Sequence, residues 1–152
     1  MEDESGIFAR ESAYLERYVQ LGIASGRVIS VSFPAAPEDD AEPDHPLLER
    51  VVAYLEGERD DFEDVTVALT VPTAHRTVLE ATRAIPYGEQ VSVERLARTA
   101  GLDADSDDDR NVVRDALASN PAPLLIPDHR VRDGPSAAPP EVEQRLRSLE
   151  GL

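Results

Sequence analysis

The adjacent pair Asp128–His129 is the part of the sequence best suited to chemistry. An imidazole beside a carboxylate resembles a general base with the acid that orients it. No nucleophile, metal-ligand set or phosphate-binding loop accompanies the pair in the sequence. The chain has no cysteine, which excludes disulfides, thiolate metal sites and thiol catalysis. The other histidines, His45 and His75, lack metal-ligand spacing, so we expect no metal and no cofactor.

The charge of the chain is strongly one-sided. Its 152 residues include 31 acids and 15 bases, for a net charge of −16, and every base is an arginine. A large acid excess without lysine resembles the proteins of salt-accumulating halophiles. Self-repulsion would destabilise such a chain in dilute buffer, whereas at molar salt the Debye length is about 3 Å and the repulsion is largely screened. The alternative is an ordinary acidic protein of a mesophile.

The length suits one domain or two small domains that share a core. No apolar run approaches the ~18 residues that span a membrane. The start Met1-Glu2-Asp3-Glu4 is acidic where a signal peptide would be basic. We therefore expect a cytoplasmic protein without membrane contact. The sequence does not set the oligomeric state, for which a monomer is the simplest expectation.

Alternating apolar residues predict a β-rich first part, residues 1–71. In a predicted hairpin, Ser25-Gly26 supplies the turn. Apolar residues alternate along both strands, at Val19, Leu21 and Ile23 and at Ile29, Val31 and Phe33. The expected elements of this part are a loose start or short helix, the hairpin, a proline-rich loop, a helix and a strand, at residues 1–17, 18–33, 34–46, 47–56 and 65–71.

The second part, residues 72–152, is predicted to be helical and carries ten of the fifteen arginines. Ser92 is a plausible N-cap, and Gly101 ends the helix that Ser92 begins. Two successive helices around this glycine turn are typical of a helix-turn-helix. Five aspartates within 103–109 precede the second of them and oppose phosphate binding. The expected helices are 78–85, 93–100, 111–119 and 140–150, with a short buried strand or loop at 124–126.

Four segments in a fixed order carry a family resemblance. They are IPYGEQVS at 85–92, Leu96-Ala97, a helix end at 116–121 that closes with Asn-Pro, and IPDHRV at 126–131. Together they resemble the O6-alkylguanine-DNA alkyltransferase family, whose members read I-P-x-G, then N-P, then I-P-C-H-R-V. The resemblance covers roughly residues 14–152. It implies an α+β fold, with a ribonuclease-H-like sheet-and-helix domain at 1–71 and a helical, winged-helix-like DNA-binding domain at 72–152.

The resemblance also implies a direct-reversal DNA repair fold. In the family a helix-turn-helix enters the minor groove, an arginine takes the place of a flipped base, and a buried cysteine accepts the alkyl group irreversibly. His129 stands at the general-base position, Glu150 at the acid that orients it, and Asn120 at the asparagine that orders the preceding turn. The candidate DNA-binding residues are Arg95, Arg98, Arg110, Asn111, Arg114 and Arg130.

Several positions depart from the family pattern. Asp128 occupies the acceptor-cysteine position, and a carboxylate is a far poorer nucleophile than a thiolate toward an alkyl carbon. Suicidal alkyl transfer is therefore excluded. Val93 replaces a tyrosine, and Asn111 stands where the intercalating arginine belongs, although Arg110 is its neighbour. The loop over the base is shortened to 134–139 and has no aromatic residue, so the wedge, pocket and stacking surface that base flipping needs are all weakened.

Three functions fit these residues. The first is a cysteine-less, alkyltransferase-like protein that binds duplex DNA, including DNA with O6-alkylguanine, without transfer. The second is a module that keeps the fold but binds DNA without reading lesions, or binds a protein partner through its acidic first part. The third is a new activity at Asp128 and His129. An ion pair between these two would be a poor environment for an apolar alkyl group.

Overall fold

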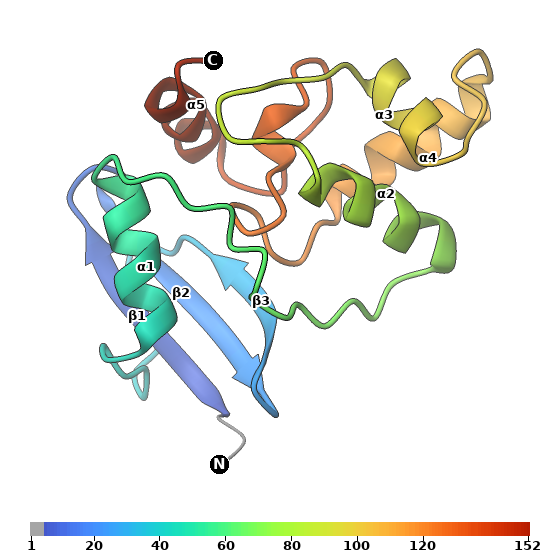
Figure 1. Ribbon diagram of the computed structural model, residues 1–152. Helices are drawn as coiled ribbons and strands as arrows, with labels where there is room; N and C mark the ends of the chain where they lie inside the picture. Colours follow the sequence, from blue (N-terminus) through green and yellow to red (C-terminus); the bar gives the residue numbers. More distant parts are fainter. Residues whose placement is uncertain (1–4) are drawn as a thin grey trace. The chain divides into compact units, whose positions relative to one another are not determined.

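The computed structural model describes residues 5–152 and has the α+β architecture that the sequence predicts (Figure 1). Residue contacts divide the chain into two compact units, of which the first ends at Ala68 and the second is Leu69–Leu152. The strands are β1 (Gly6–Ser12), β2 (Arg17–Ala24) and β3 (Arg27–Ser32). The helices within 5–152 are α1 (Pro46–Leu55), α2 (Thr73–Arg83), α3 (Val93–Thr99), α4 (Asp107–Ala118), α5 (Pro140–Glu150) and the short 3-10 helix η1 (Asp128–Arg130).

The predicted hairpin is present, but a bulge changes which residues of its second strand face the core. The strands form an antiparallel sheet in the order β1-β2-β3. Gly22 pairs with Ser30, and the next residue, Ile23, already pairs with Val28. Ile29 is therefore the extra residue and is 47% exposed, so it does not share the buried face of Val31 and Phe33 with which it alternates in the sequence. A Cβ on Gly22 would lie 2.5 Å from Ser30 Oγ, so a larger residue there would require the Ser30 side chain to move.

Two further expectations for the first unit are wrong. The stretch expected to be a loose start or short helix contains β1, which pairs with β2 from end to end. Phe8 lies opposite Leu21 and both are buried, so tertiary pairing selects the strand. The expected strand at 65–71 forms a single parallel bridge, between Val28 and Val67, and no regular element. The alternating apolar residues of this segment reflect packing on one side of an extended chain, and not a strand within a sheet. Residues 1–4, on which the signal-peptide argument depends, lie outside the described residues.

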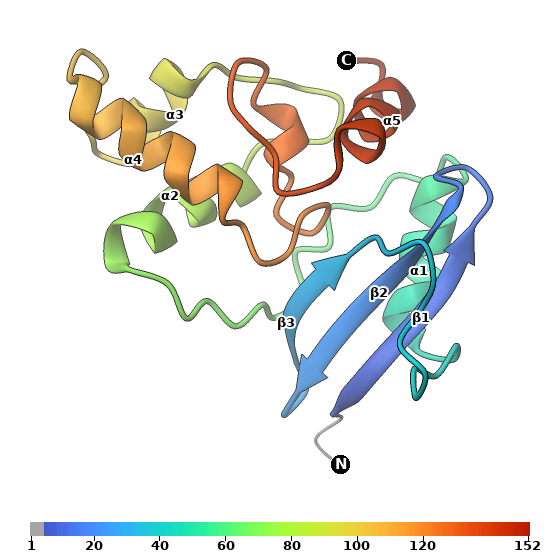
Figure 2. The same cartoon turned by 180° about the vertical axis from the view of Figure 1, so that it is seen from behind.

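Helix α1 lies across one face of the sheet, as the reverse view also shows (Figure 2). Its N-terminus is capped by His45, whose Nδ1 accepts a hydrogen bond from Leu47 N at 3.0 Å. Pro46 occupies the first helical position, where no N–H is needed. Leu48 and Val51 are fully buried against the sheet side, which places the core of this unit between α1 and the strands.

In the second unit α2 packs against both α3 and α4. Ser92 Oγ accepts from Arg95 N at 3.0 Å and caps α3 as predicted. Helix α4 begins at Asp107, earlier than the predicted residue 111, because Ser106 Oγ accepts from Asp109 N at 3.2 Å. Acids in this first turn also interact favourably with the helix dipole. Helix α5 has the predicted bounds. Within residues 5–152 no helix has the length and apolar character that a membrane crossing requires.

Candidate functional site

The segment that follows α4 brings the candidate site residues into the core. Asn120 organises it, because its amide donates to Ile126 O at 2.9 Å while its side-chain oxygen accepts from Ala122 N at 3.0 Å. Leu124 has a φ of 81°, which reverses the chain tightly. η1 then follows, and all three of its side chains are buried.

The first feature of the site is the Glu150 centre, formed by Glu150, His129, Arg130 and the backbone of Gly88. Arg130 donates from Nε to Glu150 Oε1 at 2.8 Å and from a terminal nitrogen to Oε2 at 2.9 Å. His129 Nε2 lies 2.8 Å from Oε2, and Gly88 N donates to Oε1 at 3.0 Å. Burial raises the pKa of Glu150, but the hydrogen bonds from His129 and Arg130 outweigh burial and hold that pKa well below its usual range. The carboxylate is ionised, so Nε2 of His129 donates to it.

The second feature is the Asp128 centre, formed by Asp128, Asn120, Ser136 and Ala137. The Asp128 side chain is 0% exposed. Its Oδ1 accepts from Ser136 Oγ at 2.6 Å. Its Oδ2 accepts from Ala137 N at 2.9 Å and from Asn120 Nδ2 at 3.1 Å. Burial raises the pKa of Asp128, because these three neutral donors oppose the desolvation only in part.

His129 lies between the two centres but hydrogen-bonds to only one of them. Its Nε2 is engaged by Glu150, and its Nδ1 is buried without a hydrogen-bond partner among residues 5–152. No hydrogen bond therefore joins His129 to Asp128, and the expected ion pair between them is not formed. The interpretation of Asp128 as the acid that orients His129 is wrong, because Glu150 is the carboxylate on this imidazole.

Three contributors to the site were not identified from the sequence. Ser136 and Ala137 lie in the stretch that the sequence presented only as a shortened loop, and a backbone N–H leaves no signal in a sequence. Arg147 donates to the carbonyl oxygen of His129 at 2.8 Å, which connects α5 to η1. An arginine at i+5 from Val142 on an amphipathic helix would be taken for a solvent-facing charge, so no pattern pointed to it.

The helix-turn-helix geometry is present in the second unit. α3 and α4 contact one another, and Gly101 at the end of α3 has a φ of 81°. Besides Ser92, the α3 N-terminus has a second cap, because Asp133 Oδ1 accepts from Val93 N at 2.7 Å. A Cβ on Gly134 would lie 2.8 Å from a Leu117 methyl, so glycine lets the chain after Asp133 pass close to α4. The same stretch of chain thus contacts the helix pair and the Asp128 centre.

Comparisons with known proteins identify this arrangement. A sequence model of the family described as "6-O-methylguanine DNA methyltransferase, DNA binding domain" matches residues 73–148, half of the chain. The chain belongs to this family. Among curated relatives, the methylated-DNA–protein-cysteine methyltransferase of Metallosphaera sedula is 30% identical over 109 residues, which cover 69% of this chain and 66% of that protein. The DNA base-flipping protein of Thermus thermophilus is 36% identical over 100 residues, covering 65% and 64%. The matches thus span a little under two thirds of these relatives.

Solved structures show the same fold over a larger share of the chain. The O6-methylguanine-DNA methyltransferase of Pyrococcus kodakaraensis matches with a TM-score of 0.73 at 23% identity, covering 97% of this chain and all of that one (100%). Mycobacterium tuberculosis OGT in complex with DNA matches with a TM-score of 0.66 at 22% identity, covering 82% and 77%. The family fold therefore extends through the sheet unit as well as the helical unit.

The family's helix pair carries five of the six candidate DNA-binding residues here. Arg95, Arg98, Asn111 and Arg114 are exposed on α3 and α4. Arg98 is ion-paired with Glu94 one helical turn earlier. Their role toward DNA stays a prediction.

Two of the candidate DNA-binding arginines, Arg110 and Arg130, are less exposed than the other four candidates. Arg110 is 27% exposed in its side chain and folds back, donating to Ala104 O at 2.6 Å and pairing with Asp107. Arg130 is 4% exposed and lies in the core, where it bonds Glu150 and donates to Ile85 O at 2.6 Å. The structure therefore assigns Arg130 to the Glu150 centre instead of the DNA-binding surface, because a buried guanidinium needs a carboxylate partner.

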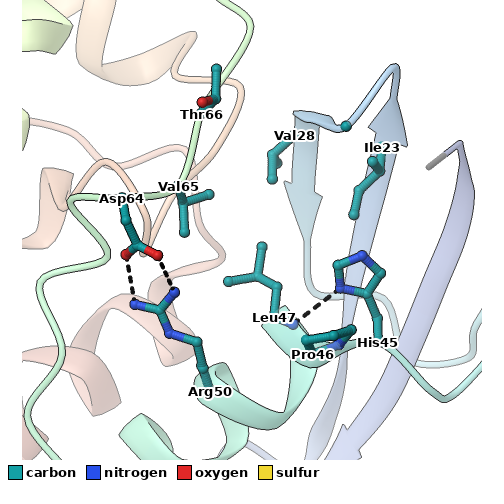
Figure 3. A pocket seen from close by; sticks show the side chains of 10 residues that line it. Ile23, Val28, His45, Pro46, Leu47, Arg50, Asp64, Val65 and Thr66 are labelled. Carbon is teal, nitrogen blue, oxygen red and sulfur yellow. Dashed lines mark hydrogen bonds and ion pairs between the residues drawn. The ribbon is translucent and has the colours of Figure 1, made fainter. Parts of the chain in front are cut away.

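A hollow of about 250 Å³ lies in the first unit, apart from all predicted site residues (Figure 3). Ile23 and Val28 contribute apolar wall, and Arg50 stands at the other side. Arg50 donates to Asp64 at 2.9 Å and to Asp60 at 2.8 and 2.9 Å. Both carboxylates are ion-paired with this arginine, so we assign no catalytic or binding role to the hollow. Within the described residues no group of three or more histidine, cysteine, aspartate or glutamate side chains could hold a metal ion.

Proposed function

We propose that this protein binds duplex DNA through the α3–α4 pair and transfers no alkyl group to itself. The observation that carries the proposal is Asp128 at the acceptor position of a chain without cysteine. The family reaction ends in a thioether, which this chain cannot form. The fold and the helix pair are those of the family, so DNA binding does not depend on the missing thiol.

The surroundings of Asp128 also argue against a substitute nucleophile. Attack on an alkyl carbon needs an exposed oxygen with a lone pair directed at that carbon. Both oxygens of Asp128 instead accept hydrogen bonds from Ser136 and Ala137, and the side chain is 0% exposed. These bonds lower the nucleophilicity of a group that is already weak.

Exposed basic residues support the DNA-binding part of the proposal. Arg95 and Arg114 lie exposed on successive helices of the pair. Two relatives point the same way, since one is named a DNA base-flipping protein and another was solved with DNA. The exposed acids Asp107 and Asp108 at the start of α4 oppose phosphate contact, so we expect modest affinity.

A second candidate function is DNA binding without lesion preference. The buried Asp128 side chain favours it, because a polar group that accepts three hydrogen bonds is a poor neighbour for an apolar alkyl group. This candidate predicts equal affinity for guanine and O6-alkylguanine, whereas the first allows a preference between the two bases.

The test is binding to duplexes with and without one O6-methylguanine, over potassium chloride up to molar concentration, with the intact protein mass recorded afterwards. We expect binding in at least one condition in which the protein is folded, and an unchanged mass. Lesion preference of about tenfold or more, about 1.4 kcal/mol, identifies a lesion sensor, and equal affinity identifies the second candidate.

A matched pair of variants tests the surface. Arg95→Ala should weaken binding, whereas Arg27→Ala, which removes an exposed arginine of β3, should not. A mass gain of one methyl group contradicts the absence of transfer. Failure of the folded protein to bind any duplex contradicts the DNA-binding role, and the search would move to protein partners of the acidic first unit.

A further inference from the structure

The strap, residues 133–138, presents two donors side by side to Asp128. The hydroxyl of Ser136 bonds one carboxylate oxygen at 2.6 Å, and the N–H of Ala137 bonds the other at 2.9 Å. Asn120 donates to the second oxygen as well, from the end of the segment that follows α4. The strap therefore satisfies both oxygens in the two-pronged manner that a carboxylate prefers.

A nucleobase edge can offer the same pair of donors. The Watson–Crick edge of guanine carries N1–H beside N2–H, which matches the two oxygens of a carboxylate. Alkylation at O6 removes the N1 proton and turns N1 into an acceptor, so one carboxylate oxygen would then face a lone pair. Enzymes that extrude a base read this edge by hydrogen bonds.

The location of the strap would allow a nucleobase to replace it as the hydrogen-bond donor to Asp128. Its first residue, Asp133, caps α3 of the DNA-binding pair through Val93 N at 2.7 Å. Ser136 and Ala137 are half-buried, so the strap residues that bond Asp128 are themselves partly exposed to solvent. If the strap left, the buried carboxylate would lose two of its three donors. An unreplaced donor at a buried carboxylate is costly, so the incoming ligand must bring its own.

We propose that Asp128 is the specificity-determining residue of this chain: it accepts the N1–H and N2–H pair of an unalkylated guanine in place of the strap and selects against O6-alkylguanine. The inference rests on the proposed function, because a base reaches Asp128 only if the helix pair binds DNA. It reverses the base preference expected of a lesion-binding family member.

The amide of asparagine supplies a sharp test, because it has one donor and one acceptor where aspartate has two acceptors. An asparagine at position 128 would donate to N1 of O6-methylguanine and accept from N2–H. Asp128→Asn is nearly isosteric, and Ser136 can rotate its hydroxyl to accept, so the strap contacts are retained.

The experiment compares duplexes with a single guanine or a single O6-methylguanine opposite an abasic site, which makes either base easy to extrude. Binding is measured by fluorescence anisotropy over a pH series, in salt that keeps the protein folded, because the carboxyl group must be ionised to accept both N–H groups. The wild type should prefer guanine by about tenfold, which corresponds to about 1.4 kcal/mol. Asp128→Asn should lose or reverse that preference.

A second variant keeps the inference testable if Asp128→Asn does not fold. Ser136→Ala removes one strap donor and leaves the carboxylate, so it should bind the guanine duplex about fivefold more tightly while the O6-methylguanine duplex gains less. Equal affinity of the wild type for the two bases, or the same preference in wild type and Asp128→Asn, overturns the inference alone. Absence of binding to every duplex overturns the proposed function as well.

Discussion

The two buried carboxyl groups of the helical unit, Glu150 and Asp128, have different partners and opposite pKa shifts. Glu150 is surrounded by His129 and Arg130, and its pKa is held well below the usual range of a glutamate. Asp128 is one residue away from His129 in the chain but is held by Ser136, Ala137 and Asn120, all of them neutral, and its pKa is raised. Both side chains are buried, and Glu150 has the charged Arg130 as a partner where Asp128 has neutral hydrogen-bond donors.

The difference shows which part of the family site this chain has kept. The imidazole of His129 bonds Glu150 through Nε2, and its Nδ1 has no hydrogen-bond partner among residues 5–152. The acceptor position carries a group that is hydrogen-bonded to its own covering segment. The charged cluster around Glu150 is thus built independently of the neutral hydrogen-bond donors around Asp128.

Breaking the Glu150 centre should lower the free energy of unfolding more than any other change proposed here. Glu150→Gln leaves Arg130 buried without an anionic partner, and loss of one member of a buried pair costs about 3–5 kcal/mol. The free energy of unfolding is measured by urea titration in molar potassium chloride. Asp64→Asn is the matched control, because it removes a carboxylate from the exposed Arg50 pair of the first unit and should cost less than about 1 kcal/mol. Equal losses in the two variants would contradict the comparison.

Breaking the Asp128 centre should cost less. Asp128→Ala removes the acceptor for Ala137 N and Ser136 Oγ, and unsatisfied buried donors cost about 1–3 kcal/mol. Asp128→Asn retains an acceptor oxygen for Ala137 N, and its amide nitrogen can donate to a rotated Ser136 hydroxyl, so it should lose less stability than Asp128→Ala. The same urea titration checks both, and a larger loss in Asp128→Asn than in Asp128→Ala would be the opposite of what we expect.

The pH dependence of stability separates the two carboxylates. Because the pKa of Glu150 is lowered on folding, its contribution is complete above the unfolded pKa of about 4.3 and is lost as the pH falls below that value. Because the pKa of Asp128 is raised, the wild type gains stability relative to Asp128→Asn as the pH falls through the folded pKa of Asp128. Thermal unfolding over a pH series should show both slopes. Absence of the second slope in wild type, or its presence in Asp128→Asn, would contradict the description of the Asp128 centre.

The two anchors of the strap should show the smallest effects. Ser136→Ala removes one hydrogen bond to Asp128, and Asp133→Ala removes one cap from α3, each at a cost of about 1 kcal/mol. Hydrogen exchange provides the finer readout. Ser136→Ala should raise exchange at Ala137, and Asp133→Ala should raise it at Val93. A change at the same amides in both variants would mean that the strap opens as one piece.

Local patterns in the sequence were sufficient for several elements. The Ser92 cap, the glycine at the end of α3 and the bounds of α5 follow from residues within one or two turns of each other, so no distant contact was needed to predict them. The family was equally visible, because its motifs are short and ordered along the chain. The convergence of Asn120, His129 and Glu150 followed from that resemblance and not from spacing alone.

The tertiary structure decided the rest, because the deciding partners are distant in sequence or are backbone atoms. β1 forms because β2 lies beside it, and Ile29 turns outward because the β2–β3 register shifts between Gly22 and Ile23. From the sequence, Asp128 stood next to a histidine and looked like half of an ion pair. In the folded protein His129 instead bonds Glu150, which lies twenty-one residues later. Asp128 accepts hydrogen bonds from an N–H and a hydroxyl of the strap. The sequence by itself determined which acids are present, and only the packing around each one determined whether it is paired with charge.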